Sequence, residues 1–253
     1  MNGFAVVIPA RFASQRLPGK PLREIAGKPM LQHVYERARE SDAARVVIAT
    51  DDRRIVDAAR GFGAEVCMTA ERHTSGTERL AEVSQQLQWP GDQVVVNLQG
   101  DEPLMPAALI NECAALLEEP GTAMATLASA IDREDDFQNP NIVKVVVDAS
   151  GNALYFSRAA IPGSRHGTAA AMSVARQHHG IYAYRVAVLL QLVAAAPAAL
   201  EKCEQLEQLR ALSIGISIRV GLPSVRPGPG VDTEQDLRAV AEHLHGVSPG
   251  SGD

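Results

Sequence analysis

Apolar residues in the first half of the chain form short, continuous runs. These runs lie at 3–8 (GFAVVI), 46–49, 66–68 and 94–98 (VVVNL), and they are rich in β-branched residues. Continuous apolarity is typical of strands that are buried on both faces of a parallel sheet. The pattern therefore predicts that these runs are parallel strands.

Helical periodicity occupies the segments between the runs. Apolar residues recur at helical spacing from Met30 to Ala38, from Ile55 to Ala59 and from Leu80 to Leu87, with Pro29 before the first segment and Gly61 after the second. The alternation of strand and helix predicts an α/β fold with a doubly wound, mainly parallel sheet. Ligands of such sheets bind beyond the carboxyl ends of the strands.

The second half of the chain is less regular. The segments IVKVVVD and ALYFSR, joined by the turn-like DASGN, predict a hairpin, and HHGIYAYR and ISIRVGL predict further strands. Helices are predicted over 186–196, 203–212 and 233–244, with Asp232 as the N-cap of the last. We therefore expect antiparallel additions to a parallel core, a single domain over residues 1–245 and a disordered tail over 246–253.

Composition narrows the class of protein. The chain has 253 residues and is 46% hydrophobic, which is enough for a sizeable core. Its net charge of −6 argues against a nucleic-acid partner, because nucleic-acid binders neutralise phosphates with clustered basic residues. Cys67, Cys113 and Cys203 lie far apart, so we expect reduced thiols. No apolar run is long enough for membrane insertion and no signal peptide is recognisable, so we expect a cytoplasmic protein.

Three cations follow the first predicted strand. Arg11, Arg16 and Lys20 lie in PARFASQRLPGKPL, a segment interrupted by prolines and by Gly19. Guanidinium groups can bind phosphate oxygens in a bidentate manner, and glycine lets the backbone approach an anion closely. We expect a triphosphate ligand, while a solvated basic loop is the alternative for this segment alone. The patterns GxxxxGK[ST] and GxGxxG are absent from the sequence, so the phosphate site is of another kind.

Acidic residues in two other segments are candidate metal ligands. VVVNLQGDEPL places Asp101 and Glu102 at the carboxyl end of a predicted strand, where carboxylates opposite a phosphate loop suit Mg2+. An acidic turn that caps the following helix is the alternative. Asp232 in GPGVDTEQDLRAV has the same two explanations, because Gln235 lies where a capping box would use it.

Other polar residues are candidates for binding the rest of a ligand. Ser75, Gly76 and Thr77 precede a predicted helix, and they suit either a ligand or a helix cap. The remaining candidates are Ser157 and Arg158 in YFSRAAIP, His178, Tyr182 and Tyr184 in HHGIYAYR, and Glu207 and Gln208 in EQLEQLRAL. A structural role explains each of these alone at least as well, but together they form the mixture that a sugar pocket needs.

Nine segments, in order from residue 4 to about 240, carry a resemblance to a known enzyme family. They are IPARFASQRLPGKPL, ATDD, HTSGTERLAEV, NLQGDEPL, NPNIVKVV, LYFSRAAIP, HHGIYAYR, LEQLRAL and GVDTEQDL. Together they resemble 3-deoxy-manno-octulosonate cytidylyltransferase, also called CMP-Kdo synthetase. The chain departs from the family at Ala183, where glycine is frequent, and over 163–177, which matches little of it.

The resemblance implies a fold, an activity and partners. The fold is that of nucleotide-diphospho-sugar transferases, with an antiparallel arm used in a homodimer. The activity is that of a cytoplasmic, Mg2+-dependent nucleotidyltransferase. This enzyme transfers CMP from CTP to 3-deoxy-D-manno-octulosonate (Kdo) and releases pyrophosphate, in lipopolysaccharide biosynthesis.

The resemblance also implies roles for the candidate residues. The CTP phosphates would be bound by Arg11, Ser14, Arg16 and Lys20, and the nucleoside by Ser75, Gly76 and Thr77. The residues implied in catalysis are Arg16, Lys20 and Asp101, and the two metal ligands are Asp101 and Asp232. The residues implied in Kdo binding are Gln99, Arg158, His178, Tyr182, Tyr184, Glu207 and Gln208.

Two other functions compete with this interpretation. A cytidylyltransferase for another acidic sugar, such as a sialic acid, is disfavoured because the opening loop of that family resembles PAR followed by a variant without RLPGKPL. A non-catalytic CTP-binding module is disfavoured because Arg11, Lys20, Asp101 and Asp232 are all present.

Overall fold

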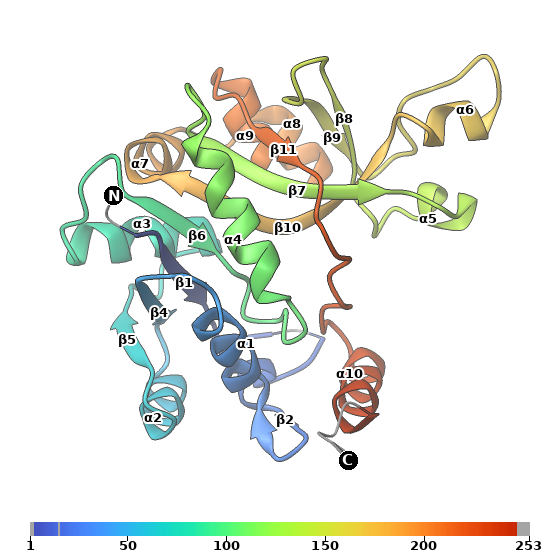
Figure 1. Cartoon of the computed structure of the whole chain (residues 1–253). Coiled ribbons are helices and arrows are strands. Elements are labelled where there is room, and N and C mark those ends of the chain that lie inside the picture. Colours follow the sequence, from blue (N-terminus) through green and yellow to red (C-terminus); the bar gives the residue numbers. More distant parts are fainter. Residues whose placement is uncertain (1–2, 15, 247–253) are drawn as a thin grey trace, which may run out of the picture. The chain divides into compact units, whose positions relative to one another are not determined.

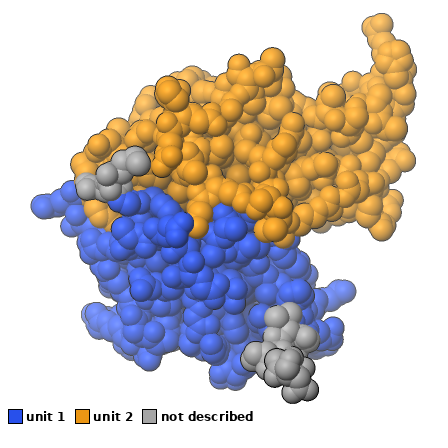
Figure 2. All heavy atoms as spheres, in the orientation of Figure 1, with its two compact units in different colours: residues 1–88, 97–110, 227–253 blue, residues 89–96, 111–226 orange. Residues whose placement is uncertain are grey.

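The computed structural model describes residues 3–14 and 16–246 and divides the chain into two compact units, coloured blue and orange in Figure 2. Unit 1 contains residues 1–88, 97–110 and 227–253, and unit 2 contains residues 89–96 and 111–226. The single domain over 1–245 stays a prediction. The predicted tail lies outside the described residues, apart from Gly246 at the end of the last helix.

Unit 1 contains parallel strands. β1 (Ala5–Pro9) pairs with β4 (Arg45–Thr50), and β4 pairs with β5 (Glu65–Met68), both in parallel (Figure 1). All residues of β1 are buried, as continuous apolarity predicts for a strand with both faces covered. Because the strands are parallel and in register, their carboxyl ends lie at the same edge of the sheet.

The helices of unit 1 lie in the segments where the sequence predicts helices, and α1 begins at the predicted residue. They are α1 (Met30–Arg39), α2 (Arg53–Gly61), α3 (Gly76–Gln86) and α10 (Glu234–Gly246). Before α1, the chain forms the 3-10 turn η1 (Lys20–Leu22) and a short antiparallel pair of β2 (Glu24–Ile25) with β3 (Lys28–Pro29). Asp52 caps α2, since its carboxylate accepts the amide N–H of Arg54 at 2.9 Å.

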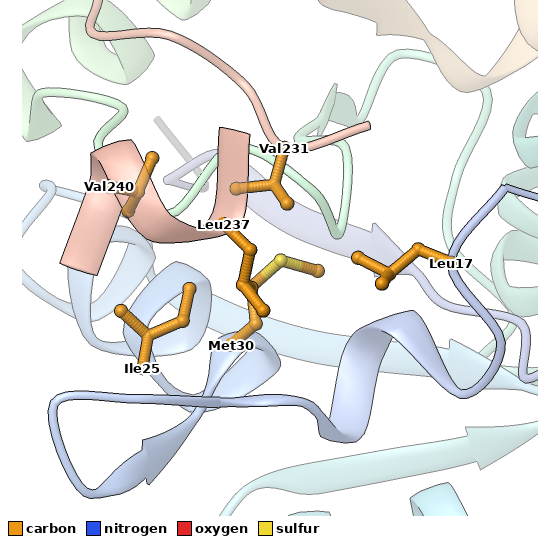
Figure 3. Packing of buried hydrophobic residues seen from close by; sticks show 6 residues of the cluster. All are labelled: Leu17, Ile25, Met30, Val231, Leu237 and Val240. Atoms are coloured by element: carbon orange, nitrogen blue, oxygen red, sulfur yellow. The ribbon is translucent and has the colours of Figure 1, made fainter. Parts of the chain in front are cut away.

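The C-terminal helix α10 packs on the loop that carries the predicted phosphate-binding cations. Leu237 and Val240 of α10 join a buried cluster with Leu17, Ile25 and Met30, to which Val231 also contributes (Figure 3). Leu17 lies between Arg16 and Lys20 in the sequence. A residue of the cationic loop is therefore fixed by the hydrophobic core of unit 1.

The N-cap of α10 differs from the prediction. Thr233 caps the helix, because its hydroxyl accepts the amide N–H of Asp236 at 3.2 Å and the Asp236 carboxylate accepts the amide N–H of Thr233 at 2.8 Å. This reciprocal pair is a capping box, shifted by one residue from the expected one. The prediction that Asp232 is the N-cap, with Gln235 as its partner, is wrong, and the Asp232 side chain is available for other contacts.

The division between the two units falls within β6 (Val94–Asn97) and α4 (Ala107–Ala115). Strand β6 corresponds to the predicted run VVVNL. The loop that follows it belongs to unit 1 and contains Gln99, Gly100 and Asp101.

Unit 2 has mainly antiparallel pairing. Its strands are β7 (Met124–Ala130), β8 (Lys144–Val147), β9 (Ala153–Ser157), β10 (Arg176–Arg185) and β11 (Arg219–Gly221). β10 pairs with β7 and β8 in antiparallel fashion, β8 and β9 form the predicted hairpin, and β11 pairs with β7 in parallel (Figure 1). The hairpin turn is closed by Asp148, whose carboxylate accepts the amide N–H groups of Ser150 and Asn152, both at 2.8 Å.

Short helices complete unit 2. They are η2 (Leu116–Glu118), α5 (Glu134–Gln138), α6 (Thr168–Met172), α7 (Val186–Ala194), α8 (Ala199–Glu204) and α9 (Gln208–Ser213). The prediction of one continuous helix over 203–212 is wrong, because Gln205 adopts a left-handed conformation with φ of 55° and ends α8. The break is stabilised by a buried ion pair between Glu201 of α8 and Arg210 of α9.

These elements confirm the predicted α/β class, with parallel strands and an antiparallel arm. Within the described residues, no helix is long and apolar enough to cross a membrane. Cys67 and Cys113 are buried free thiols, and Cys203 is a free thiol on the surface.

Candidate active site

Two segments of unit 1 pack closely against the end of β1. A Cβ atom on Gly100 would lie 2.8 Å from the carbonyl oxygen of Pro9, which real Cβ atoms do not tolerate. A Cβ atom on Gly76, the first residue of α3, would lie 3.0 Å from Cγ of Pro9. The loop after β6 and the start of α3 therefore meet at the carboxyl edge of the parallel strands, where ligands of such sheets bind.

The cationic loop after β1 is held in shape by local contacts. Gly19 adopts a left-handed conformation with φ of 65°, which glycine accepts without steric cost. The Phe12 ring lies against Gly19 on one side, and the Arg54 guanidinium carbon lies 3.3 Å from the ring centroid. The Ser14 hydroxyl accepts the amide N–H of Leu17 at 3.4 Å. The loop is thus a folded segment, which argues against a solvated basic loop.

Lys20 brings together the two predicted metal ligands. Its ammonium nitrogen lies 2.7 Å from Oδ2 of Asp101 and 3.0 Å from Oδ1 of Asp232. The residue is 8% exposed, so these ion pairs are shielded from solvent on the lysine side. Arg16 is exposed and approaches the same Asp232 oxygen at 3.0 Å. Residues as far apart in sequence as Arg16 and Asp232 therefore form one charged cluster.

The two aspartates are not explained by helix capping. Thr233 caps α10, and α4 begins only at Ala107, whereas the carboxylate of Asp101 contacts Lys20. The main chain around them is also joined, because Val231 donates its amide N–H to the carbonyl oxygen of Asp101 at 2.9 Å. Both residues are thus positioned as a pair by their backbones and by a shared lysine.

Glu102 is the third carboxyl group of this cluster. Burial raises the pKa of Glu102 to about 8, with further contributions from the negative charges of Asp101 and Asp232. Its carboxyl group lies against Gly230, where a Cβ atom would be 3.0 Å from Oε1. At neutral pH the carboxyl group of Glu102 is therefore mainly protonated.

The donor set fits a magnesium ion that is shared with a phosphate ligand. Asp101 and Asp232 supply hard oxygen atoms that converge on one point, now in contact with the Lys20 ammonium. Within the described residues, no group of three or more His, Cys, Asp or Glu side chains is placed to hold a metal. Mg2+ is commonly held by one or two carboxylates together with phosphate oxygens and water, so two aspartates are sufficient.

The predicted nucleotide-binding residues at the start of α3 also have structural roles. The Ser75 hydroxyl accepts the amide N–H of Glu78 at 3.3 Å and so caps α3, while Thr77 is buried. Arg11 is exposed, and its guanidinium group donates to the carbonyl oxygen of Thr74 at 3.5 Å. Gln99 lies in the same part of unit 1, with Oε1 3.8 Å from the Cβ position of Gly76.

Three predicted sugar-binding residues lie in one aromatic row in unit 2. Ring centroids are separated by 5.1 Å between Phe156 and His178, by 5.3 Å between His178 and Tyr182, and by 5.9 Å between Tyr182 and Tyr184. Burial raises the pKa of the Tyr182 hydroxyl well above its ordinary value, and Tyr184 and Glu207 contribute in the same direction. Glu207 is therefore close enough to act electrostatically on this row.

The histidines of β10 are neutral at physiological pH. Burial, with a smaller contribution from His179, lowers the pKa of His178 to about 3. Burial, with a smaller contribution from Arg226, lowers the pKa of His179 to about 4. A neutral imidazole has one nitrogen that donates and one that accepts a hydrogen bond, which suits contact with a hydroxyl group.

Arg158 and Gln208 lie at α8 and α9 of unit 2: Arg158 contacts the last residue of α8, and Gln208 is the first residue of α9. The Arg158 guanidinium donates to the carbonyl oxygens of Glu204 at 2.8 Å and Pro140 at 3.2 Å. Its backbone N–H donates to the Glu204 carboxylate at 2.9 Å. Gln208 is buried at the start of α9. Arg158 is thus oriented by fixed contacts, and its role toward a ligand stays a prediction.

Three residues of unit 2 with marked polar contacts were missed from the sequence. Lys144 is fully buried and donates to the carbonyl oxygens of Asn139, Ile142 and Arg158 at 2.6–2.8 Å. Glu204 accepts from Arg158, and Thr126 contacts His178. A charged or polar residue inside an otherwise apolar strand, as in KVVV or MATLASA, is a signal that could have drawn attention to Lys144 and Thr126.

Comparison with known proteins defines the class. The family model described as cytidylyltransferase matches residues 5–218, and the chain belongs to the cytidylyltransferase family. Its relatives narrow the class further. The chain is 52% identical over 241 residues to the 3-deoxy-manno-octulosonate cytidylyltransferase of Aliivibrio fischeri (strain MJ11), covering 94% of this chain and 97% of the relative. It is 56% identical over 245 residues to the enzyme of that name from Marinobacter nauticus, covering 92% and 94%.

A solved structure agrees with these relatives. The structure of CMP:2-keto-3-deoxy-manno-octonic acid synthetase complexed with CTP is similar with a TM-score of 0.88 and 42% sequence identity, covering 96% of this chain and 99% of that chain. The resemblance stated from the sequence motifs, and the fold type that it implied, are thereby confirmed.

Proposed function

We propose that the protein transfers CMP from CTP to Kdo, giving CMP-Kdo and pyrophosphate for lipopolysaccharide biosynthesis. The observation that carries this function is the cluster of Lys20, Asp101 and Asp232 at the edge of the parallel strands. It occurs in a chain about half identical to enzymes with this name.

The cations of the loop after β1 would bind the triphosphate of CTP. In the reaction, a bond forms between the anomeric hydroxyl oxygen of Kdo and the α-phosphorus, and the bond between the α-phosphorus and the leaving pyrophosphate oxygen breaks. The hydroxyl proton is released to solvent. Arg11, Arg16 and Lys20, with Ser14, would hold the phosphates in line and stabilise the negative charge that develops on pyrophosphate. No covalent enzyme intermediate is needed, since the sugar hydroxyl is itself the nucleophile.

Asp101 and Asp232 would hold Mg2+ at this site. When bound, Mg2+ would neutralise charge on the phosphates and help the sugar hydroxyl to ionise. Lys20 is shared between the two aspartates, so it would keep them close together and stand next to the phosphates at the same time. Ser75, Gly76 and Thr77 would meet the nucleoside near the start of α3.

Polar groups would bind the acidic sugar. Arg158 would pair with the Kdo carboxylate, and the hydroxyl groups would be bound by Gln99, His178, Tyr182, Tyr184, Glu207 and Gln208. Neutral His178 supports this assignment, because a neutral ring can accept a hydrogen bond from a sugar hydroxyl. A homodimer, a location in the cytoplasm and the absence of a nucleic-acid partner complete the proposal.

Pyrophosphate release from CTP tests the function. The purified protein is assayed with Mg2+, with and without Kdo, and with sialic acid and UTP as alternative substrates. We expect release only when CTP and Kdo are both present, and we expect Lys20→Ala to lower kcat/KM strongly while CTP still binds. Equal or greater release with sialic acid would favour the other acidic-sugar enzyme. CTP binding without release for any sugar would favour a non-catalytic module.

A further inference from the structure

The antiparallel pairing of β10 with β7 is interrupted beside the aromatic row. His179 pairs with Leu127 and Tyr182 pairs with Thr126, which are adjacent in β7. Gly180 and Ile181 therefore have no pairing partner in β7 and form a bulge. Such a bulge leaves backbone carbonyl groups without ladder partners, and bulges are frequent next to active sites. The carbonyl groups of the bulge therefore need another donor.

Thr126 supplies that donor. Its side chain is fully buried, and Oγ1 lies 2.7 Å from the carbonyl oxygen of Ile181 and 3.1 Å from that of His179. The same oxygen lies 3.1 Å from Nε2 of His178. A hydroxyl group has a single proton to donate, and the carbonyl oxygens can only accept. The proton of Thr126 is thus committed to the bulge.

The remaining contact fixes the state of the His178 ring. Because the Thr126 hydroxyl donates to a carbonyl oxygen, it can only accept in its contact with Nε2, so Nε2 must carry the proton. In a neutral ring, Nδ1 is then the acceptor. Within the part of the chain that the structure describes, His178 Nδ1 makes no hydrogen bond.

The hydroxyl group of Tyr182 is a second polar group in the aromatic row that a ligand could contact. Among the described residues, the buried hydroxyl oxygen of Tyr182 has no partner at full hydrogen-bond geometry, and the Thr126 hydroxyl is close enough to act on the pKa of Tyr182 in the lowering direction. The Tyr182 ring lies 5.3 Å from the His178 ring. The acceptor Nδ1 therefore belongs to a ring that lies next to Tyr182, whose hydroxyl group is close to Thr126.

We propose that Thr126 is a positioning residue that fixes His178 in the tautomer with the proton on Nε2, and so presents Nδ1 as an acceptor for a hydroxyl group of the sugar substrate. The second half of this statement rests on the proposed function, because it assumes that His178 meets Kdo. The first half concerns the free protein and can be tested without any substrate.

The tautomer is measured by long-range 1H–15N NMR on the full chain labelled with 15N-histidine. The chain has seven histidines, and the signals that disappear in His178→Asn identify residue 178. We expect a protonated Nε2 and an unprotonated Nδ1 in the wild type and in Thr126→Ser, which keeps the hydroxyl. Thr126→Val lacks it, and we expect the two tautomers to mix. A proton on Nδ1 of the wild type would overturn the proposal, even if Thr126→Val does not fold.

Steady-state kinetics test the consequence for the substrate. We expect Thr126→Val to raise KM for Kdo about tenfold, the loss expected for about one hydrogen bond, with KM for CTP unchanged and with activity restored in Thr126→Ser. The matched control is Ser129→Ala, since Ser129 Oγ lies 3.0 Å from Nε2 of His179 in the same strand pair. We expect its KM for Kdo to stay at the wild-type value.

The outcomes separate this proposal from the proposed function. Unchanged KM for Kdo in Thr126→Val, in an enzyme that makes CMP-Kdo, would overturn the role of Thr126 in presenting His178. An equal rise in KM for Kdo and CTP would also overturn it, because it would indicate a general structural defect. If the wild type releases no pyrophosphate with Kdo, the proposed function fails, while the NMR result still decides the tautomer.

Discussion

Acidification should destabilise the fold through the two histidines of β10. His178 and His179 have pKa values of about 3 and about 4 in the folded state, against 6.5 in an unfolded chain. Between these values the unfolded state binds more protons than the folded state, so the free energy of unfolding falls as the pH falls below about 6.5. Above that pH both states are neutral and the two histidines contribute no pH dependence.

The magnitude follows from the two shifts. Each pH unit in this window costs about 1.4 kcal/mol per histidine. Between about pH 6.5 and about pH 5, each histidine therefore removes about 2 kcal/mol of stability, and the pair removes about 4 kcal/mol. Glu102 acts in the opposite direction, because its pKa is raised to about 8 and over the same range its folded form holds a proton that the unfolded form lacks. A single pH profile would mix these contributions.

A difference measurement isolates the histidines. Urea unfolding is followed at about pH 8 and about pH 5 for the wild type and for the double variant His178→Gln with His179→Gln. The contribution of Glu102 is common to both proteins and cancels. We expect the wild type to lose about 4 kcal/mol more than the variant on acidification. Equal losses in the two proteins would refute the reasoning, since they would show that the imidazoles accept protons in the folded state.

Three substitutions test unit 1. Asp101→Asn should lower turnover by orders of magnitude without unfolding the protein, because the cluster around Lys20 loses a charged oxygen ligand, and pyrophosphate release measures it. Leu237→Ala should lower the free energy of unfolding by about 2–5 kcal/mol in urea titrations, because it opens a cavity in the cluster of Figure 3. Gly100→Ala should lower both Tm and turnover, because its Cβ atom would lie 2.8 Å from a backbone carbonyl oxygen at the end of β1.

Asp101→Asn and Gly100→Ala each have a matched control. Asp135→Asn changes an aspartate whose side chain is 86% exposed, and it should leave turnover unchanged. Gly163→Ala adds a Cβ atom with no neighbour within 4 Å, and it should leave Tm unchanged. Near-normal turnover in Asp101→Asn would contradict the metal assignment, and a Tm of Gly100→Ala equal to that of Gly163→Ala would contradict the close approach.

The parallel strands could be predicted because a strand that is buried on both faces is a continuous apolar run in the sequence. β1 consists of apolar residues and proline, and all of them are buried. The hairpin of unit 2 could also be predicted, because its turn depends on the local hydrogen bonds of Asp148. Local chemistry that suffices to form an element is visible in the sequence.

Asp232 shows where local chemistry is not sufficient. An aspartate just before a helix fits an N-cap and a ligand equally well in sequence, and the neighbouring Thr233 fits the N-cap too. The structure resolves the choice through Asp236, which closes a capping box with Thr233, and through Lys20, which approaches Asp232 from a distant part of the chain. The decisive contact is therefore not local.

The break between α8 and α9 has a similar origin. Gln205 is a good helix former by propensity, yet it adopts a left-handed conformation. The two short helices are held by the buried pair of Glu201 with Arg210 and by the buried side chain of Leu206. Tertiary contacts here override local preference, which a periodic pattern cannot reveal.

The charged residues of the candidate site could be predicted from the sequence, whereas the polar residues around the aromatic row could be predicted only in part. Lys20 and Asp101 stand out in the sequence because they follow predicted strands, and Asp232 stands out because it follows a Gly/Pro-rich segment. The structure brings the three residues together. Thr126 was missed, because a threonine in a buried strand is common and its polarity is a weak signal. Its importance comes from the bulge in β10, which is a property of strand pairing.

Identification of the reaction product tests the central claim most directly. The protein is incubated with CTP, Kdo and Mg2+, and the mixture is followed by 31P NMR. The account predicts that a new phosphodiester signal of CMP-Kdo and the signal of pyrophosphate appear in equal amounts as CTP disappears. Pyrophosphate that forms with free CMP and without a sugar phosphodiester would contradict transfer to Kdo.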